Sequence, residues 1–264
     1  GDIYAMGAVP HSALAIASVP FASRKIMEET LGELMAGCVL TLNEHDTALA
    51  GGHSNELQEL AFGLTVNGYG SPDRLLLKKG LRPGDDLILC KPLGTGTLLA
   101  ADMRLKAKGR WMEAAFEQML VSNRSAASVF LQHGARCCTD ITGFGLAGHL
   151  MEMLAPTNAT ARIDLDALPV LEGALDCLKQ RIFSSLHSEN SRTGDLIDAG
   201  KSNASSPLFQ LLFDPQTAGG LLAGIPAEQS FGCLAALQEA GYPEARIVGR
   251  VEEAHREHPG IVVV

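Results

Sequence analysis

The sequence predicts an α+β protein of two domains, in which mixed sheets are flanked by helices. Strand and helix patterns follow one another without a strict β-α-β repeat, which argues against a single doubly wound parallel sheet. The 264 residues, 46% apolar and 19% charged, are enough for two globular domains. Segment 80–86 breaks both periodicities, so we predict domains at 1–80 and 85–264. Asp85 and Asp86 fall in this linker turn, and we expect both to be solvated.

The first domain is predicted to contain three strands and one long helix. Its opening apolar run is short and closes at Pro20, which is typical of a buried strand. The helix has apolar residues at helical spacing on one face and charged residues on the other. In order, the elements are a strand at 11–19, a helix from Ser23 to Leu42, and strands at 47–50 and 61–66 with a glycine-bearing loop at 51–54 between them.

The second domain is predicted to interleave strands with helices and to contain one long polar loop. Its strands are apolar runs bounded by turn residues, at 87–90, 136–139, 161–165, 221–225, 245–251 and 261–264. Helical patterns run up to about 133, then cover 146–154, a mixed stretch to 178, a segment between 206 and 213, and 228–240. Residues 184–206 are rich in Ser, Asn and Gly, so we expect a mobile loop there.

Composition and charge exclude several classes of partner. A net charge of −9 and a pI near 5.4 give a field that repels a nucleic-acid backbone, and no run of Lys and Arg interrupts it. The longest apolar stretches, 13–19 and 221–225, are too short to span a bilayer, and no signal-like segment opens the chain. We therefore expect a cytoplasmic protein that binds neither nucleic acid nor membrane.

The six cysteines indicate buried, reduced thiols. They stand in apolar surroundings without a C-x-x-C pair, which favours neither a zinc site nor a disulfide framework. The neighbours Cys137 and Cys138 fall in a predicted strand, where alternation directs the two side chains to opposite faces. They are therefore a weak candidate for a redox pair.

Four short segments combine glycines with an acidic or hydroxyl-bearing residue beside a predicted strand. Glycine lets backbone N–H groups approach a phosphate closely, and a neighbouring carboxylate can hold a magnesium ion that bridges to phosphate oxygens. Such a set would build a metal-dependent nucleotide site, although neither a P-loop nor a dinucleotide-binding glycine motif occurs. The segments are residues 1–7 (GDIYAMG), 51–54 (GGHS), 139–149 (TDITGFGLAGH) and 214–220 (DPQTAGG).

Each of these residues also has a purely structural interpretation. Asp2 could be a helix N-cap or a surface carboxylate, and Asp140, between a strand and a glycine loop, could be a ligand or a cap. His53 and His149 are typical of histidines whose ring nitrogens bond to backbone carbonyls. Residues 214–217 would form an ordinary turn before a buried strand.

Taken together, in this order and at these separations, the four segments resemble the selenophosphate synthetases, also called selenide, water dikinases. The likeness covers nearly the whole chain, and its last two segments are the most specific. The wider superfamily, with aminoimidazole ribonucleotide synthetase, the hydrogenase-maturation dehydratase and thiamine-monophosphate kinase, shares a two-domain architecture and the use of ATP. The resemblance therefore implies an aminoimidazole ribonucleotide synthetase-like fold. The matching sequences are DIYAMGA, ALAGGHS followed by FGLTVNG, KPLGTG, TDITGFGLAGHL and FDPQTAGGLL.

The resemblance implies an ATP-dependent phosphotransferase that uses magnesium. The implied reaction transfers a phosphoryl group from ATP to selenide and gives selenophosphate, AMP and orthophosphate, mainly by positioning and charge neutralisation. Asp2 and Asp140 match metal-binding carboxylates, and Asp2 also counts among the ATP-binding residues. Gly52, His53 and Ser54 match a segment that contacts ATP across a dimer interface. The first domain would then be part of an ATP-binding and dimerisation domain in a homodimer.

The amino-terminal arm of the family is expected to precede Gly1. In the family it carries a cysteine or selenocysteine and a lysine, followed by a strand with further metal-binding aspartates, so we expect the catalytic residues there. We accordingly expect an isolated chain of residues 1–264 to bind nucleotide weakly and not to turn over. Residues 10–17 (PHSALAIA) resemble forms that are fused behind a flavin-dependent oxidoreductase.

Two alternatives stay open at the level of sequence. One is another ATP-dependent synthetase or kinase of the same superfamily, with residues 184–206 in a substrate lid, and binding assays with candidate metabolites would separate it. The other is a catalytically inactive interaction module that keeps the fold. The presence of both Asp2 and Asp140 argues against the second alternative, because an idle site has no physical need for paired carboxylates.

Overall fold

The chain folds into two units, and one of them is formed by two separate stretches of the sequence. The computed structural model describes residues 1–204, 206–254 and 260–264. One unit comprises Gly7–Leu75, and the other comprises Gly1–Met6 together with Leu76–Val264. The opening residues therefore fold with the second part of the chain and not with the segment that directly follows them.

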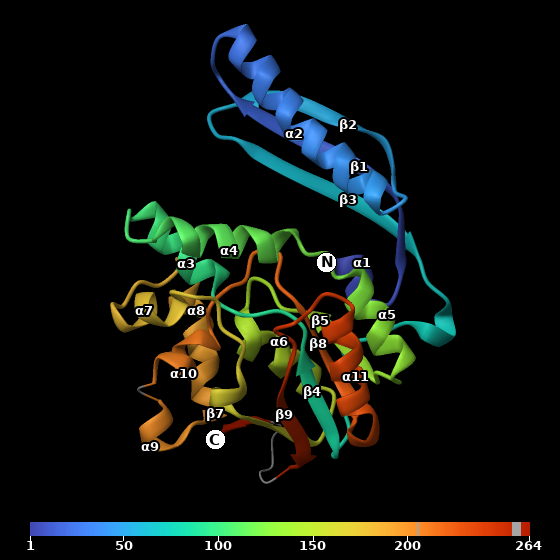
Figure 1. Ribbon diagram of the computed structural model, residues 1–264, viewed down its shortest axis with the longest axis vertical. Helices are drawn as coiled ribbons and strands as arrows, with labels where there is room; N and C mark the ends of the chain where they lie inside the picture. The colour runs from blue at the N-terminus through green and yellow to red at the C-terminus, as the bar shows by residue number, and fades with distance from the viewer. Residues whose placement is uncertain (205, 255–259) are drawn as a thin grey trace. The chain divides into compact units, whose positions relative to one another are not determined.

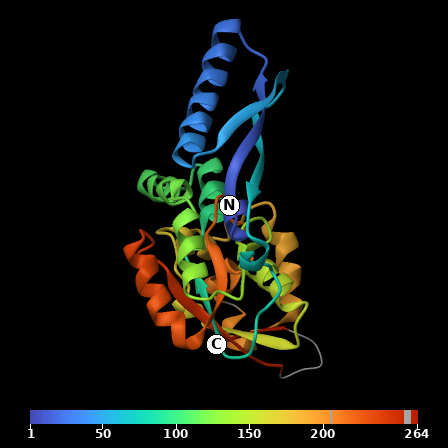
Figure 2. The ribbon, with the colours of Figure 1, turned by 90° about the vertical axis from the view of Figure 1, so that its right-hand side faces the viewer.

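The smaller unit, all of whose residues are described, is a three-stranded sheet with one long helix. Its elements are β1 (Val9–Pro20), α2 (Arg24–Glu44), β2 (Ala48–Leu57), β3 (Ala61–Tyr69) and the 3-10 turn η1 (Pro72–Arg74). The sheet has the order β2-β1-β3, with β1 parallel to β2 and antiparallel to β3. Helix α2 runs along this sheet, as Figures 1 and 2 show, and packs on β1 and β2. Its apolar face buries Cys38 and Leu42 against Ala13, in agreement with the helical spacing.

The glycine segment 51–54 does not form the loop that we predicted. It continues β2 without a break, and the strand pairs with β1 apart from a register shift at Ala13–Leu14. The reason is the close approach of β1, since a Cβ atom on Gly52 would lie 2.8 Å from the backbone nitrogen of Ala15 and nearer still to its carbonyl oxygen. The absence of a side chain on Gly52 thus lets the backbones of β1 and β2 approach closely next to the register shift. The glycine does not form a turn.

The larger unit is built, within its described residues, on a seven-stranded mixed sheet of order β5-β8-β4-β9-β6-β10-β7. These strands are β4 (Asp85–Leu89), β5 (Cys137–Asp140), β6 (Ala159–Ile163), β7 (Ile197–Asp198), β8 (Leu221–Pro226), β9 (Arg246–Glu253) and β10 (Gly260–Val263). Strand β10 is parallel to β6 and β7, and the other neighbouring pairs are antiparallel. The mixture confirms the α+β prediction and excludes a doubly wound parallel sheet.

Helices cover both faces of this sheet (Figure 1). The helices of the larger unit are α1 (Asp2–Ala5), α3 (Thr95–Met103), α4 (Gly109–Leu120), α5 (Arg124–Gln132), α6 (Gly145–Leu154), α7 (Ala174–Lys179), α8 (His187–Asn190), α9 (Gly200–Asn203), α10 (Pro207–Leu211) and α11 (Ala227–Glu239), with 3-10 turns η2 (Leu165–Ala167) and η3 (Ser191–Leu196). Helices α3, α4 and α7 form a separate apolar cluster around Trp111. In the described part of the chain, no helix is both long and apolar enough to cross a membrane.

The two faces of the larger sheet carry separate cores. On one face, α6 and α10 pack over Leu87, Leu89 and Cys137. On the other face, α1, α5 and α11 pack over Ile88 and Cys138. Cys137 and Cys138 thus point to opposite faces, as strand alternation predicts, and all six cysteines are buried and unpaired.

Asp85 and Asp86 are buried, although we predicted that both would be solvated. They are 2% and 4% exposed and begin β4. The Nε of Arg136 donates to Asp85 at 2.8 Å, and the Nε of Arg250 donates to Asp86 at 2.7 Å. A carboxylate is tolerated in such a position when it is paired. The prediction was wrong because these arginines lie 51 and 164 residues along the chain, outside any local pattern.

Residues 184–206 are largely folded, which corrects the prediction of a mobile loop. Helix α8, turn η3, strand β7 and helix α9 occupy most of this stretch, and residue 205 lies outside the described residues. Two buried polar side chains anchor it. His187 Nε2 lies 3.1 Å from the carbonyl oxygen of Gln210, and the amide of Asn190 donates to two carbonyls elsewhere in the unit. The polar composition suggested a loop, but it does not exclude a folded segment, because the side chains that anchor this one are themselves polar.

Candidate functional site

The first and third glycine segments meet in the larger unit. Helix α1, which begins at Asp2, packs against β5, which ends at Asp140. A Cβ atom placed on Gly1 would lie 3.5 Å from Oδ2 of Asp140, so the residue before Asp2 is in contact range of that carboxylate. Two acidic residues that are 138 positions apart in sequence (140 − 2) are thereby brought to one end of a strand.

Both carboxylates are available to a ligand. Asp2 is exposed and Asp140 is half-buried, and neither side chain has a hydrogen bond or ion pair within the described residues. Magnesium commonly takes one or two protein carboxylates and completes its shell with water and phosphate oxygens, so this pair fits the ion chemically. The described residues contain no group of three or more His, Cys, Asp or Glu side chains that could hold a metal by themselves.

Backbone hydrogen bonds hold the loop after Asp140 in place. The N–H of Ile141 donates to the carbonyl of Gly220 at 2.8 Å, and the N–H of Gln216 donates to the carbonyl of Thr142 at 2.9 Å. The buried amide of Asn190 donates to the carbonyl of Gly143 at 2.8 Å. The fourth glycine segment, 214–220, is therefore a support for the Asp140 loop.

The glycine turn before α3 is filled by protein groups. Gln216 Oε1 accepts from the backbone N–H of Gly94 at 2.9 Å and of Thr95 at 3.2 Å. Asp214 is fully buried, and its carboxylate accepts from the hydroxyl of Thr97 at 2.8 Å and from the amide of Gln216 at 3.0 Å. The amide groups that an anion would use at this helix end are thus already satisfied. The KPLGTG segment consequently acts as structure at this point and not as a phosphate cradle.

Asp214 titrates far from its ordinary range. Burial raises its pKa to about 6, although hydrogen bonds from Thr97 and Gln216 lower the pKa in part. The carboxyl group is also fully enclosed, and its oxygens are already bonded to Thr97 and Gln216. We therefore assign Asp214 a structural role.

Lys91 is a second buried charge with a structural role. It is 3% exposed, and its ammonium donates to the carbonyl oxygens of Gln118, Val121 and Ala218. Burial lowers its pKa. Because all three donors of the ammonium are engaged, Lys91 ties the end of α4 to the segment that supports the Asp140 loop.

His149 lies on α6 directly behind the Asp140 loop. It is 5% exposed, with Nε2 at 3.2 Å from Oγ1 of Thr142 and Nδ1 at 3.2 Å from Oε2 of Glu152. Lys78 Nζ approaches the same Glu152 oxygen at 2.6 Å. Burial lowers the pKa of His149, and the negative charge of Glu152 offsets only part of this shift. The prediction of backbone partners for His149 is wrong, since both ring nitrogens face side chains.

A pocket of ≈ 390 Å³ opens beside the same loop. Phe144, which is 58% exposed, contributes an aromatic ring to its wall, and Glu152 and Glu189 contribute carboxylates. The remaining lining residues are Gly143, Gly148, Leu186, Asn190 and Thr193.

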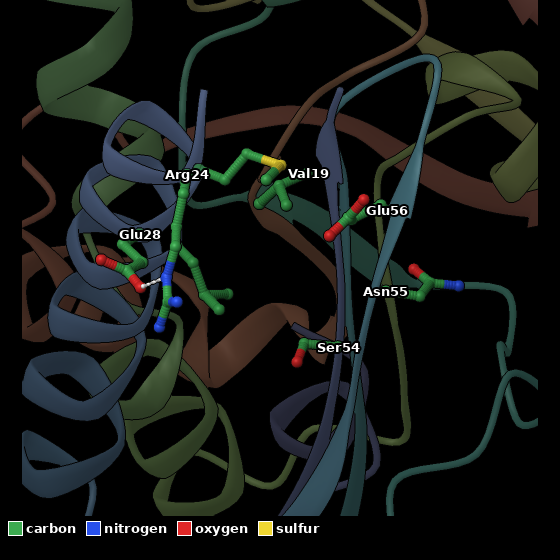
Figure 3. Close-up of a pocket in the computed structure, with 8 residues that line it drawn as sticks. Val19, Arg24, Glu28, Ser54, Asn55 and Glu56 are labelled. Carbon is green, nitrogen blue, oxygen red and sulfur yellow. Dashed lines mark hydrogen bonds and ion pairs between the residues drawn. The ribbon is translucent and has the colours of Figure 1, made fainter. Parts of the chain in front are cut away.

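The second glycine segment belongs to the smaller unit. Gly52, His53 and Ser54 are exposed residues of β2, paired with Ala15, Ile16 and Ala17 of β1. Successive side chains on a strand alternate, so His53 and Ser54 point to opposite faces. Figure 3 shows Ser54 beside a pocket of ≈ 540 Å³ between α2 and β2, where Arg24 and Glu28 form an ion pair at 2.8 Å.

Comparison with known proteins assigns the chain to a family. The family described as AIR synthase related protein, C-terminal domain, matches residues 82–261, and the corresponding N-terminal domain matches residues 1–69. A selenide, water dikinase of Pelobacter propionicus is 37% identical over 253 residues, which cover 96% of this chain and 72% of that protein. The chain belongs to the selenide, water dikinase family. This makes it a phosphotransferase of the selenide, water dikinase type and confirms the resemblance seen in its motifs.

Further relatives agree with this assignment. Selenide, water dikinases of Trichlorobacter lovleyi and Geobacter metallireducens are 40% and 36% identical, over 85% and 99% of this chain. The chain spans 64% and 75% of the length of these two relatives.

Solved structures of other proteins agree with this chain in architecture. The hydrogenase maturation protein HypE in complex with ATP superposes with a TM-score of 0.70 at 16% identity, covering 96% of this chain and 68% of HypE. Thiamine-monophosphate kinase from Stenotrophomonas maltophilia gives a TM-score of 0.72 at 20% identity, covering 98% of this chain and 74% of the kinase. At such identities the likeness shows the fold, and it confirms the two-domain architecture that the motifs implied.

Sequence reasoning missed the residues that support the Asp140 loop. Lys78 and Asn190 carry no local signal, because their partners lie in other elements of the unit. The His149–Glu152 pair could have been found, since residues three apart on a helix share one face. Gln216 was seen only as part of a turn, yet its side-chain oxygen accepts from the backbone N–H groups of Gly94 and Thr95.

Proposed function

We propose that this chain belongs to an enzyme that transfers a phosphoryl group from ATP to selenide with consumption of one water, giving selenophosphate, AMP and orthophosphate. The observation that carries the proposal is the meeting of helix α1 with the end of β5, which brings Asp2 and Asp140 together without protein partners. Both residues match the family's metal-binding carboxylates, and relatives of 36% to 40% identity are named selenide, water dikinase.

In this proposal Asp2 and Asp140 hold magnesium, and Asp2 also contributes to ATP binding. The ion, when bound, supplies positive charge against the phosphate oxygens during transfer. The chain itself supplies orientation, because the backbone hydrogen bonds from Ile141 to Gly220 and from Gln216 to Thr142 fix the loop that bears Asp140. A rigid loop of this kind places the carboxylate before the nucleotide arrives, which lowers the ordering cost of the reacting complex.

The smaller unit is proposed to contact ATP through Gly52, His53 and Ser54 and to take part in a homodimer. Support comes from the exposure of all three residues on β2. The expected domains, 1–80 for ATP binding and dimerisation and 85–264 as the second, would then follow the two units except that residues 1–6 and 76–80 fold with the larger one. The cytoplasmic location expected from the composition stays a prediction.

The proposal is tested by following ATP with 31P NMR in the presence of magnesium and selenide under anaerobic conditions. The assay uses the full protein in which residues 1–264 occur, as wild type and as single variants. We expect selenophosphate, AMP and orthophosphate to form in equal amounts in the wild-type protein. The reaction should be lost in its Asp140→Asn variant, since that carboxamide no longer offers a charged oxygen ligand.

Other outcomes would contradict the assignment. Accumulation of ADP would indicate an ordinary kinase, and AMP formation that does not depend on selenide would exclude selenide as the acceptor. The matched control is Asp102→Ala on α3, an exposed carboxylate outside the site, which should leave product formation unchanged.

A further inference from the structure

A chain of four side chains leads from the surface of the larger unit to the loop that carries Asp140. Lys78 Nζ lies 2.6 Å from Oε2 of Glu152, and this carboxylate oxygen lies 3.2 Å from Nδ1 of His149. The other ring nitrogen, Nε2, lies 3.2 Å from Oγ1 of Thr142. Thr142 is the second residue after Asp140. The proposed function has no use for these four residues as ligands, so their ordered arrangement calls for a separate explanation.

The direction of each hydrogen bond follows from the chemistry of the groups. An ammonium donates and a carboxylate accepts, so Lys78 donates to Glu152 and Nδ1 of His149 carries the hydrogen that faces the same carboxylate. In a neutral imidazole the second nitrogen, Nε2, is then an acceptor. The Thr142 hydroxyl must therefore donate to Nε2, which fixes the rotation of the hydroxyl and the side chain that bears it.

Thr142 is held through its backbone as well as its side chain. Its carbonyl accepts from the N–H of Gln216 at 2.9 Å and from the N–H of Gly145 at 3.1 Å. The hydroxyl contact to His149 adds a restraint from α6, on which the imidazole is 5% exposed and lies 5.5 Å from the ring of Phe144. With both nitrogens engaged and the ring buried, His149 is placed to hold the loop and not to exchange a proton with a substrate.

We propose that His149 is a positioning residue, oriented by Glu152 and Lys78, which fixes Thr142 and thereby keeps the 140–145 loop in the conformation that presents the Asp140 carboxylate. The effect on the loop stands on the contacts alone. The effect on magnesium and nucleotide rests on the proposed function. These two parts of the inference can be tested separately.

Two pairs of variants separate the hydrogen bond from simple packing. The amide of glutamine reaches the position of Nε2, so His149→Gln can still accept from Thr142, whereas the amide of asparagine reaches only the position of Nδ1 and contacts Glu152. Thr142→Ser keeps the hydroxyl, and Thr142→Val removes it at nearly constant shape. In each pair, one variant keeps the contact between α6 and the loop and the other loses it.

The first measurement is hydrogen exchange of the peptide that covers residues 140–147, by mass spectrometry without any ligand. The second is the affinity of the chain for a non-hydrolysable ATP analogue as a function of magnesium, by calorimetry. We expect His149→Asn and Thr142→Val each to accelerate exchange in this peptide and to weaken magnesium-dependent binding roughly 10-fold or more, as loss of a group that orients a metal ligand commonly does. His149→Gln and Thr142→Ser should stay close to wild type in both measurements.

The double variant His149→Asn, Thr142→Val decides whether the two residues act as one unit. If His149 acts through Thr142, the double variant should be no worse than either single variant, because each already removes the same interaction. Effects that multiply, or exchange and binding that stay at the wild-type level in Thr142→Val, would overturn the proposal. Should His149→Asn fail to fold, the Thr142 pair gives the same decision.

Failure of the proposed function gives a different result. A wild-type chain that binds no analogue at any magnesium concentration would contradict the proposed metal and nucleotide site. The exchange of residues 140–147 would still show whether His149 fixes the loop, since that measurement uses no ligand. If hydrogen exchange of residues 140–147 is equally fast in His149→Gln and His149→Asn, the hydrogen bond does not fix the loop and His149 contributes by packing alone.

Discussion

The substitution Gly219→Ala should destabilise the larger unit by placing a methyl group where the backbone of Ile141 passes. A Cβ atom at this position would lie 2.9 Å from Cβ of Gln216 and 3.1 Å from the carbonyl carbon of Ile141, with the carbonyl oxygen closer still. Ordinary contacts of such atoms begin near 3.4 Å. The φ angle of Gly219 is not positive, so the cost is steric and not conformational.

The size of this loss of stability depends on whether the atoms around the added methyl group can move aside. Overpacking in a well-packed region costs about 1–3 kcal/mol. We expect about 3 kcal/mol here, at the upper end, because one of the two neighbours is backbone that cannot rotate aside. For a unit of this size that loss lowers the melting temperature by roughly 6–12 °C. Because Gly219 packs on the residue after Asp140, the variant should also bind magnesium and nucleotide more weakly.

The assay is thermal unfolding of Gly219→Ala beside Gly143→Ala. Gly143 belongs to the supported loop, but a Cβ atom there would meet nothing within 4 Å, so this variant is a matched control. We expect the melting temperature of Gly143→Ala to stay within a few degrees of wild type, as surface changes cost about 0.5 kcal/mol or less. A Gly219→Ala variant that melts with wild type would refute the claim that segment 214–220 is packed tightly against the loop.

Further variants test three other parts of the structure. Arg136→Met leaves the buried carboxylate of Asp85 without its ion pair and should cost about 3 kcal/mol in urea unfolding, whereas an unchanged midpoint would contradict the pairing. Gly52→Ala should disrupt the β1–β2 pairing and lower the melting temperature of the smaller unit. Its control is Gly37→Ala, inside α2 with open space around it, which should stabilise the smaller unit by about 0.5–1 kcal/mol. A change of stability in the same direction for both variants would contradict this account. Asp214 has a pKa of about 6 when folded against 3.8 unfolded, so its contribution is fully present below 3.8 and is lost, by up to about 3 kcal/mol, as the pH rises through 6. The stability of wild type relative to Asp214→Asn should therefore fall between about pH 3 and pH 7 and level off above that range, and a difference that grows with pH would contradict the raised pKa.

The elements of the fold were largely predictable because they depend on local periodicity. The helix from Arg24 to Glu44 and the alternation at Cys137 and Cys138 follow from spacing alone. The errors arose where a distant partner decides the outcome. Gly52 sits in a strand because β1 approaches it, and Asp85 is buried because Arg136 reaches it from 51 residues away.

The candidate site was predictable only in its motifs. The local pattern left Asp2 and Asp140 open between ligand and structural roles, and the family resemblance singled them out; the structure brings their two elements together. The same pattern could not distinguish a segment whose side chains bind a ligand from a segment that only supports the site. Residues 214–220 looked equivalent, yet Asp214 and Gln216 are occupied by internal hydrogen bonds. Such a distinction depends on which donors remain free after folding, and a linear sequence does not contain that information.

The central claim is that Asp140 belongs to a site for magnesium and nucleotide, and its most direct test is the melting temperature with and without both ligands. A ligand that binds only the folded state must raise the melting temperature, by an amount equivalent to about 2.7 kcal/mol at a concentration 100 times its Kd. We predict a rise for wild type and Asp102→Ala that requires magnesium and a non-hydrolysable ATP analogue together, and no rise for Asp140→Ala. An equal rise in Asp140→Ala, or none in wild type, would contradict the account.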